Sequence, residues 1–186
     1  MTFGIGAPVA VAVAEEAYTC GMRTLIVAGS AGSLSPHATL GTIVVPVSAL
    51  REEGTSHHYA PHDVPAEADP GVLNTVKSVL AERGTPYLQG VNRTTDAIYR
   101  EHKAKIAMYR AAGVLTVDME LSALYTLGAC RGTATGAVLA VSDELHGESW
   151  EIGFGSEDVT RGMARAGRIA LEAATRIAKR AQGASP

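Results

Sequence analysis

The sequence contains none of the common residue spacings that mark a metal or cofactor site. Its two cysteines, Cys20 and Cys130, belong to no C-x-x-C or C-x-x-H pattern, and no H-E-x-x-H stretch occurs. Gly4 and Gly6 are followed by Ala-Pro-Val, which breaks the dinucleotide-binding pattern G-x-G-x-x-G. The nucleophile pattern G-x-S-x-G is absent as well. We therefore expect neither a metal nor a cofactor, and we expect the cysteines to be buried, reduced thiols.

The chain also lacks a surplus of basic residues and any long apolar run. It carries 16 Lys and Arg against 19 Asp and Glu, so neither a nucleic-acid partner nor a membrane partner is indicated. No stretch is long and apolar enough to span a bilayer. The apolar run near the N-terminus has no basic residues before it and ends at Glu15 and Glu16, unlike a signal peptide. We expect a cytoplasmic protein with a single domain over residues 1–186.

Predicted strands and helices alternate along the chain, which is typical of an α/β fold with buried strands. The predicted strands lie within 23–29, 41–54, 87–99, 114–120 and 133–145, and the second of them is expected to bend at Pro46. The predicted helices are 8–21, 71–84, 102–113, 121–132 and 155–181. Because the chain opens on a glycine turn with no strand before it, we expect the fold to lack its first strands or to borrow them.

Polar or glycine-rich stretches end several of the predicted strands. They read AGSAGS (28–33), NRTTD (92–96), VDME (117–120) and AVSDE (140–144). Ligands of α/β sheets collect at the carboxyl ends of strands, so we expect these stretches to line one cleft. The first belongs to LIVAGSAGSL (25–34), which is predicted to be a buried strand running into a glycine-rich turn. Such turns often hold an anion.

Two carboxylates in VDMELSA suggest a sugar site. Asp118 and Glu120 share one face if the chain is extended, and a turn at the strand end could bring Met119 to the same ligand. A carboxylate accepts hydrogen bonds from sugar hydroxyls, and a methionine packs against the sugar ring. The alternative is that Asp118 or Glu120 caps the helix that follows.

Asp143 follows an apolar run, with Ser142 beside it. A carboxyl group at the mouth of a partly dry cleft can have a raised pKa and act as a general acid. Protonation of a leaving base requires such a group. The alternative is that Ser142 or Asp143 is the N-cap of a helix.

Taken together, the stretches GIGAPVAVAVAEEAY, EGTSHHY, TTDAIYRE, VDMELSALY and VSDELHGESWEIGF resemble the nucleoside phosphorylase superfamily of uridine phosphorylases, purine nucleoside phosphorylases and nucleosidases. The resemblance covers essentially the whole chain, in order, as an N-terminally shortened member. It implies a three-layer α/β/α sandwich with a central mixed, barrel-like sheet that lacks the first strands. Members cleave the N-glycosidic bond of nucleosides with phosphate or with water.

The resemblance also implies roles for individual residues. Asp143 would protonate or hydrogen-bond the base, Glu120 would bind the ribose hydroxyls, and Met119 would pack against the sugar. Ile98 and Tyr99 would line the base site, and Ser30 would lie at the edge of phosphate or ribose. The implied substrate-binding residues are Gly29, Ser30, Thr95, Ile98, Tyr99, Met119 and Glu120.

The departures from the family pattern favour water over phosphate as the acceptor. Phosphorylases carry an arginine where this chain has Val27, and valine offers no charge-assisted donor to a phosphate. The other phosphate arginines of the family belong to the N-terminal portion that this chain is expected to lack. Residues 29–33 then suit water or a sugar hydroxyl. In the stretch REHKAK after Tyr99, His102 and Ala104 stand near the places of the Gln and Arg that read uracil in uridine phosphorylases, so we expect a purine-like or modified base.

Three functional hypotheses follow. The first is a nucleoside N-glycosidase that uses water. The second is a nucleoside phosphorylase completed by another subunit or by an upstream segment. The third is a non-catalytic or repurposed nucleoside-binding subunit. Because absent first strands would expose sheet edges and apolar faces, we expect a homo-oligomer, or a hetero-oligomer with a full-length paralogue.

Overall fold

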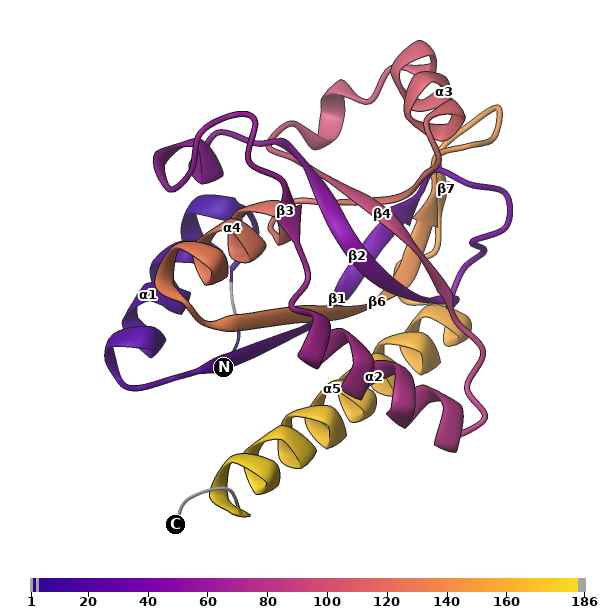
Figure 1. Cartoon of the computed structure of the whole chain (residues 1–186). Helices are drawn as coiled ribbons and strands as arrows, with labels where there is room; N and C mark the ends of the chain where they lie inside the picture. The colour runs from indigo at the N-terminus through magenta and orange to yellow at the C-terminus, as the bar shows by residue number, and fades with distance from the viewer. Residues whose placement is uncertain (1, 3, 184–186) are drawn as a thin grey trace.

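The computed structural model describes residues 2 and 4–183, and it contains a closed barrel of strands (Figure 1). The barrel closes because β2 pairs with β6 on one side and with β4 on the other. Short strands β3 and β7 extend the sheet at its two ends. The strands are β1 (Thr24–Ser33), β2 (Ile43–Glu52), β3 (Ala66–Glu67), β4 (Leu88–Thr95), β5 (Val114–Asp118), β6 (Ala134–Glu144) and β7 (Glu151–Ile152). The mixed, barrel-like sheet expected from the sequence is confirmed.

The barrel strands run in two directions. β1 and β6 are parallel to each other, and β2, β4 and β5 run together in the opposite sense. β1 and β5 pair near their carboxyl ends, with Gly32 opposite Val117 and Ser33 opposite Thr116. This antiparallel junction brings the carboxyl ends of β1, β4, β5 and β6 to one place. The polar strand ends therefore gather although their strands do not all point the same way.

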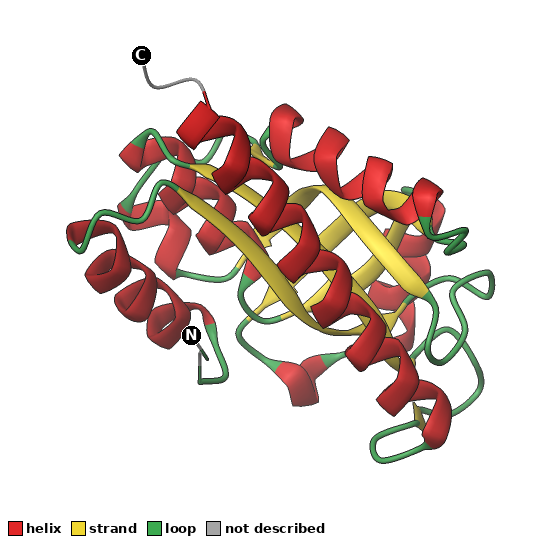
Figure 2. Ribbon diagram, turned by 90° about the horizontal axis from the view of Figure 1, so that it is seen from below, coloured by secondary structure: helices red, strands yellow, loops and turns green. Residues whose placement is uncertain are grey.

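Helices cover the barrel on two sides. Figure 1 shows α1 and α4 on the left and α2 and α5 below, and Figure 2 shows α5 running across the strands from beneath. The helices are α1 (Ala7–Thr19), α2 (Pro70–Glu82), α3 (Lys103–Ala111), α4 (Leu121–Arg131) and α5 (Glu157–Gly183), with the 3-10 turns η1 (Thr55–His58) and η2 (Ile98–Arg100). Among residues 2 and 4–183, no helix has both the length and the apolar character needed to cross a membrane.

Each side has its own apolar core. On the lower side, Val76 and Leu80 of α2 and Ile169 of α5 are buried against Ile43 and Val138 of the barrel. On the left side, α1 and α4 pack together through alanines and leucines such as Ala10 and Leu124. The run from Leu121 to Gly128 is buried all round, as expected for a helix enclosed between a sheet and another helix.

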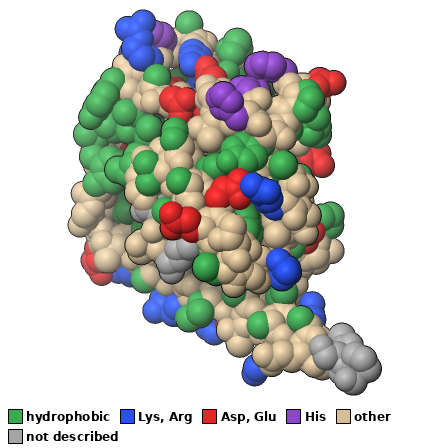
Figure 3. Space-filling model, turned by 90° about the vertical axis from the view of Figure 1, so that its left-hand side faces the viewer, with side chains coloured by type: hydrophobic (Ala, Val, Ile, Leu, Met, Phe, Trp, Pro, Cys, Tyr) green, Lys and Arg blue, Asp and Glu red, His purple; other side chains and the backbone are tan. Residues whose placement is uncertain are grey.

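Figure 3 looks onto the side formed by α1, α4 and η1. Histidine side chains gather near the top of this view, and His57 of η1 stacks on His62 with ring centroids 3.9 Å apart. The Arg51 guanidinium donates to the carbonyl oxygen of Ala60 at 2.7 Å, and its Nη2 lies 3.2 Å from Nδ1 of His57. These contacts give a defined shape to much of the segment that joins β2 to β3.

Two local predictions are wrong. The AGSAGS stretch is not a turn: β1 continues to Ser33, because β6 pairs with it along its whole length, with a register shift between Ala31 and Gly32. Cys20 and Cys130 are exposed rather than buried. They lie at the C-cap of α1 and in the last turn of α4, where each helix leaves its packed face.

The expected bend of β2 at Pro46 is confirmed. The pairing of β2 with β4 shifts register between Pro46 and Ser48, so the strand bulges where proline offers no N–H to the ladder. The carbonyl oxygen of Pro46 accepts a hydrogen bond at 3.0 Å from the hydroxyl group of Tyr125, which belongs to α4. The bulge thus ties α4 to the barrel.

Candidate active site

A cavity of about 990 Å³ opens where the carboxyl ends of β1, β4, β5 and β6 meet. The structure brings every site residue predicted from the sequence to its wall. They are Gly29, Ser30, Thr95, Ile98, Tyr99, Met119, Glu120 and Asp143. The expected single cleft at the polar strand ends is therefore present. The loops after β4 and β6 and the start of α1 complete the wall.

Glu120 is held by the glycine turn at the start of α1. Its Oε1 accepts the Gly6 N–H at 2.6 Å, and its Oε2 accepts the Met119 N–H at 3.3 Å. Gly6 has φ 101°, a conformation that side chains disfavour, and this aims its N–H at the carboxylate. Burial raises the pKa of Glu120, while these two backbone hydrogen bonds oppose the rise. The result is an acceptor-rich group on the cavity wall.

Asp118 takes the capping role that the sequence left open between the two acids. Its Oδ2 accepts the Leu121 N–H at 2.8 Å at the start of α4. Its Oδ1 accepts from Asn92 Nδ2 at 2.7 Å and from Thr94 Oγ1 at 2.6 Å. Burial raises the pKa of Asp118 to about 6, and the donors from Thr94, Asn92 and Leu121 partly offset that rise. Asp118 therefore supports the cavity floor, whereas Glu120 has no helix-capping contact.

Asp143 lies near the end of β6 and is only 7% exposed. The Ser142 hydroxyl donates to its Oδ1 at 2.7 Å, and the Trp150 indole N–H donates to its Oδ2 at 2.7 Å. The alternative reading of Ser142 or Asp143 as a helix N-cap is wrong. No helix begins there, because β6 turns back as a hairpin into β7, where Ile152 pairs with Asp143.

The cavity wall is acidic. Glu101, Asp118, Glu120, Asp143 and Glu148 line it, and among the described residues no arginine does. The one lysine in the described lining, Lys103, is exposed and lies 3.4 Å from Glu148 in an ion pair. Val27 lines the wall with an apolar side chain that also packs against α1 and α4. The described wall thus offers little to neutralise a phosphate dianion.

A buried arginine, which the sequence reading missed, supports the part of the cavity wall that carries Ile98 and Tyr99. Arg93 is fully buried on β4, forms ion pairs with Glu101 and with Glu52 (3.1 Å to the latter), and lies 4.8 Å from the centre of the Tyr109 ring. Glu101 directly follows η2, which carries Ile98 and Tyr99. Arg93 therefore anchors the turn that presents both residues. An arginine inside an otherwise buried strand was the signal available in the sequence.

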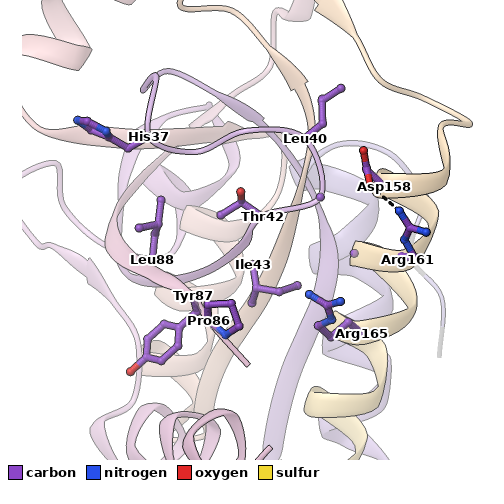
Figure 4. Close-up of a pocket in the computed structure, with 12 residues that line it drawn as sticks. His37, Leu40, Thr42, Ile43, Pro86, Tyr87, Leu88, Asp158, Arg161 and Arg165 are labelled. Carbon is purple, nitrogen blue, oxygen red and sulfur yellow. Dashed lines mark hydrogen bonds and ion pairs between the residues drawn. The ribbon is translucent and has the colours of Figure 1, made fainter. Parts of the chain in front are cut away.

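A second, smaller cavity of about 370 Å³ lies between α5 and the beginnings of β2 and β4 (Figure 4). His37, Tyr87, Asp158, Arg161 and Arg165 are among its lining residues. Arg161 is paired with Asp158 at 2.7 Å. None of the predicted site residues reaches this cavity, and its chemistry is unrelated to the carboxylates of the large one.

Comparisons with known proteins agree with this geometry. The family model described as "Phosphorylase superfamily" matches residues 1–178. Uridine phosphorylase of Treponema pallidum is 32% identical over 185 residues, covering 93% of this chain and 70% of that protein.

Two solved structures show the same architecture. Purine nucleoside phosphorylase of Toxoplasma gondii, in complex with immucillin-H, matches with a TM-score of 0.89 and 28% identity over 96% of this chain and 73% of its own. AMP nucleosidase of Bacteroides thetaiotaomicron matches with a TM-score of 0.81 and 25% identity over 97% of this chain and 72% of its own.

Proposed function

The chain belongs to the phosphorylase superfamily, and from that premise we propose that it cleaves the N-glycosidic bond of a nucleoside in the large cavity. The similar proteins include uridine and purine nucleoside phosphorylases and a nucleosidase. Enzymes with these names cleave the N-glycosidic bond. The convergence of Glu120, Met119 and Asp143 on one cavity supports the assignment.

In the proposed reaction, Asp143 faces the base and Glu120 faces the sugar. The Glu120 carboxylate accepts hydrogen bonds from the ribose hydroxyls, and Met119 packs against the ring. As the bond to the base breaks, positive charge develops on the sugar, and the acidic wall stabilises that charge. Proton donation from Asp143 to the departing base contributes roughly 10²–10⁴-fold to the rate. The acceptor then forms the new bond to the sugar carbon; where it is water, it loses one proton, so that nucleoside and water give free base and ribose. Ile98 and Tyr99 bound the base.

We further propose that water is the acceptor rather than phosphate. The observation that carries this choice is the acidic lining of the cavity, in which no arginine takes part among the described residues. Val27 occupies β1 where a charged donor would be needed. Gly29 and Ser30 offer small, polar surface that suits water or a sugar hydroxyl.

The test is a base-release assay on the purified protein with inosine, adenosine and uridine, each with and without inorganic phosphate. Free base and the sugar product are measured, and Asp143→Asn serves as the catalytic control. We expect base release that does not depend on phosphate and yields free ribose. Release that strictly requires phosphate would show phosphorolysis and contradict the choice of water. Absence of release from every nucleoside would contradict the proposed cleavage itself.

A further inference from the structure

Trp150 forms a hydrogen bond with Oδ2 of Asp143, an oxygen that a base bound at Asp143 would also contact. It is the chain's single tryptophan, and its indole N–H donates to Asp143 Oδ2 at 2.7 Å. It lines the large cavity from the end of the loop 145–150, which joins β6 to β7. Trp150 as a whole residue is nevertheless 43% exposed. A large apolar ring is thus held at the cavity rim by one polar contact.

The Trp150 indole supplies one of the hydrogen-bond donors that the buried Asp143 carboxyl group needs. Asp143 is buried, and no ion pair with it is found within residues 2 and 4–183, so its oxygens rely on the Ser142 hydroxyl and the Trp150 indole. An indole nitrogen can only donate, and it therefore pairs with Oδ2 as a hydrogen-bond acceptor. A base that receives a proton from Asp143, or donates an N–H to it, competes with the indole for Oδ2. Both cannot hold that oxygen in the same geometry.

The loop 145–150 is anchored by hydrogen bonds at its two ends, and its tip is exposed. The Leu145 N–H donates to Ser33 O at 2.8 Å, and the Gly153 N–H donates to Ser142 O at 3.0 Å. The Leu145 side chain also packs against the core below α3. Residues 147–150 between these anchors are exposed. The Lys103–Glu148 ion pair that ties the tip to α3 is itself exposed, and such pairs contribute little.

We propose that Trp150 is a displaceable cap on Asp143. In the empty protein the indole N–H holds Oδ2; an incoming nucleobase takes that oxygen, and the indole ring moves off to pack against the bound base. This inference rests on the proposed function, because it requires a base at Asp143. It makes Trp150 a positioning residue that sets base affinity through competition.

Fluorescence of Trp150 reports the displacement directly, since no other tryptophan contributes. The native protein is titrated with hypoxanthine, adenine and uracil under excitation that tyrosine does not absorb, and binding is measured in parallel by calorimetry. We expect a saturable change in tryptophan emission with the same Kd that calorimetry gives. Asp143→Ala, which frees the indole, is expected to shift the emission before any base is added.

Trp150→Phe keeps an aromatic ring but removes the competing N–H. We expect it to bind the preferred base roughly three- to tenfold more tightly than the native protein, the factor that one net hydrogen bond represents. Damage to the fold would weaken binding instead. Phe154→Leu is the matched control, because Phe154 is another exposed aromatic of the same cavity with no hydrogen bond to Asp143. It is expected to gain no affinity.

The outcomes separate the cap from the proposed function. If calorimetry detects a base while tryptophan emission stays constant, or if Trp150→Phe binds no more tightly, the cap is wrong and the proposed function stands. If the native protein binds none of the bases by calorimetry, the cap is overturned, and the proposed function is judged by the base-release assay alone. Matching fluorescence and calorimetric titrations together with the affinity gain of Trp150→Phe support the cap.

Discussion

Asp118 and Glu120 lie two residues apart at the end of β5, yet their carboxylates have separate partners. Asp118 Oδ2 accepts the Leu121 N–H at 2.8 Å, and Glu120 Oε1 accepts the Gly6 N–H at 2.6 Å. Asp118 accepts from donors of the barrel and of α4, whereas Glu120 accepts only from backbone N–H groups among the contacts found within residues 2 and 4–183. Asp118 is structural, and Glu120 is the acid that we propose meets the substrate.

Glu120→Gln separates these roles. The amide oxygen can still accept from Gly6, so we expect the thermal unfolding midpoint to stay close to that of the native protein. Loss of the negative charge beside the sugar is expected to lower nucleoside cleavage by about two orders of magnitude. Base release and thermal unfolding are measured on the same preparation, with free-base affinity as the control for an intact cavity. Cleavage at the native rate would rule out the sugar role of Glu120.

Asp118 makes stability depend on pH in a defined direction. Because burial raises its pKa from 3.8 to about 6, the folded state keeps this proton in a range where the unfolded chain has lost it. The contribution of Asp118 is therefore fully present below about pH 4 and is lost as pH rises through about 6. Relative to Asp118→Asn, the free energy of unfolding of the native protein is expected to fall by about 3 kcal/mol over that range.

Urea denaturation of both proteins at a series of pH values checks this prediction. Titrating groups that do not interact with Asp118, such as Glu82 with its lowered pKa, are present in both proteins and cancel in the difference. A difference that stays flat between pH 4 and pH 6 would show that Asp118 is ionised throughout.

The two glycines of AGSAGS are predicted to respond differently to alanine. A Cβ at Gly32 would lie 2.5 Å from Leu145 Cδ1 and 3.0 Å from Asp143 Oδ2, whereas a Cβ at Gly29 would meet Leu139 Cδ2 at an ordinary 3.5 Å. We expect Gly32→Ala to cost about 1–3 kcal/mol of stability and to lower activity by displacing Asp143. Gly29→Ala is expected to leave the unfolding free energy within about 0.5 kcal/mol. Equal losses in chemical denaturation of the two variants would contradict the close approach at Gly32.

Removal of Arg93 leaves the buried Glu101 carboxylate without its cation, whereas Glu52 keeps its ion pair with Lys105. Arg93→Met is expected to lower the free energy of unfolding by about 3–5 kcal/mol, because Glu101 stays buried and unpaired. Adding Glu101→Gln removes that charge and should restore part of the loss. The two single variants and the double variant form a thermodynamic cycle measured by urea denaturation. Strictly additive effects would mean that the two side chains do not stabilise each other.

Much of the fold can be predicted from the sequence because its helices and strands have clear patterns of apolar residues. The buried apolar runs and the alternation of elements predict the strands and helices within a few residues, as with the predicted 121–132 and the observed Leu121–Arg131. The polar strand ends predict the cavity. The stretch AGSAGS was predicted to be a turn, but it belongs to β1 because it pairs with β6. This pairing depends on residues more than 100 positions away, so the local sequence does not indicate it.

The supporting contacts of the site could not be predicted, for the same reason. Gly6 meets Glu120 across 114 positions of sequence, and nothing near either residue indicates the other. Trp150 reaches Asp143 because of the register of the β6–β7 hairpin. The burial of Arg93 depends on α3 and on β2 together. Residue types indicated where chemistry could occur, and tertiary structure decided which atoms meet.

Binding of a ligand in the large cavity is coupled to the integrity of the short junction between β1 and β5. Asp143 belongs to the strand pair β1–β6 and Glu120 follows the group β2–β4–β5. These two halves meet on one side through Gly32–Val117 and Ser33–Thr116, beside the cavity, and on the other side through the pairing of β2 with β6. A chain in which this junction has opened carries both carboxylates but no binding site. A molecule that bridges Glu120 and Asp143 therefore acts as an additional link between the halves, and it stabilises the closed barrel in proportion to its occupancy.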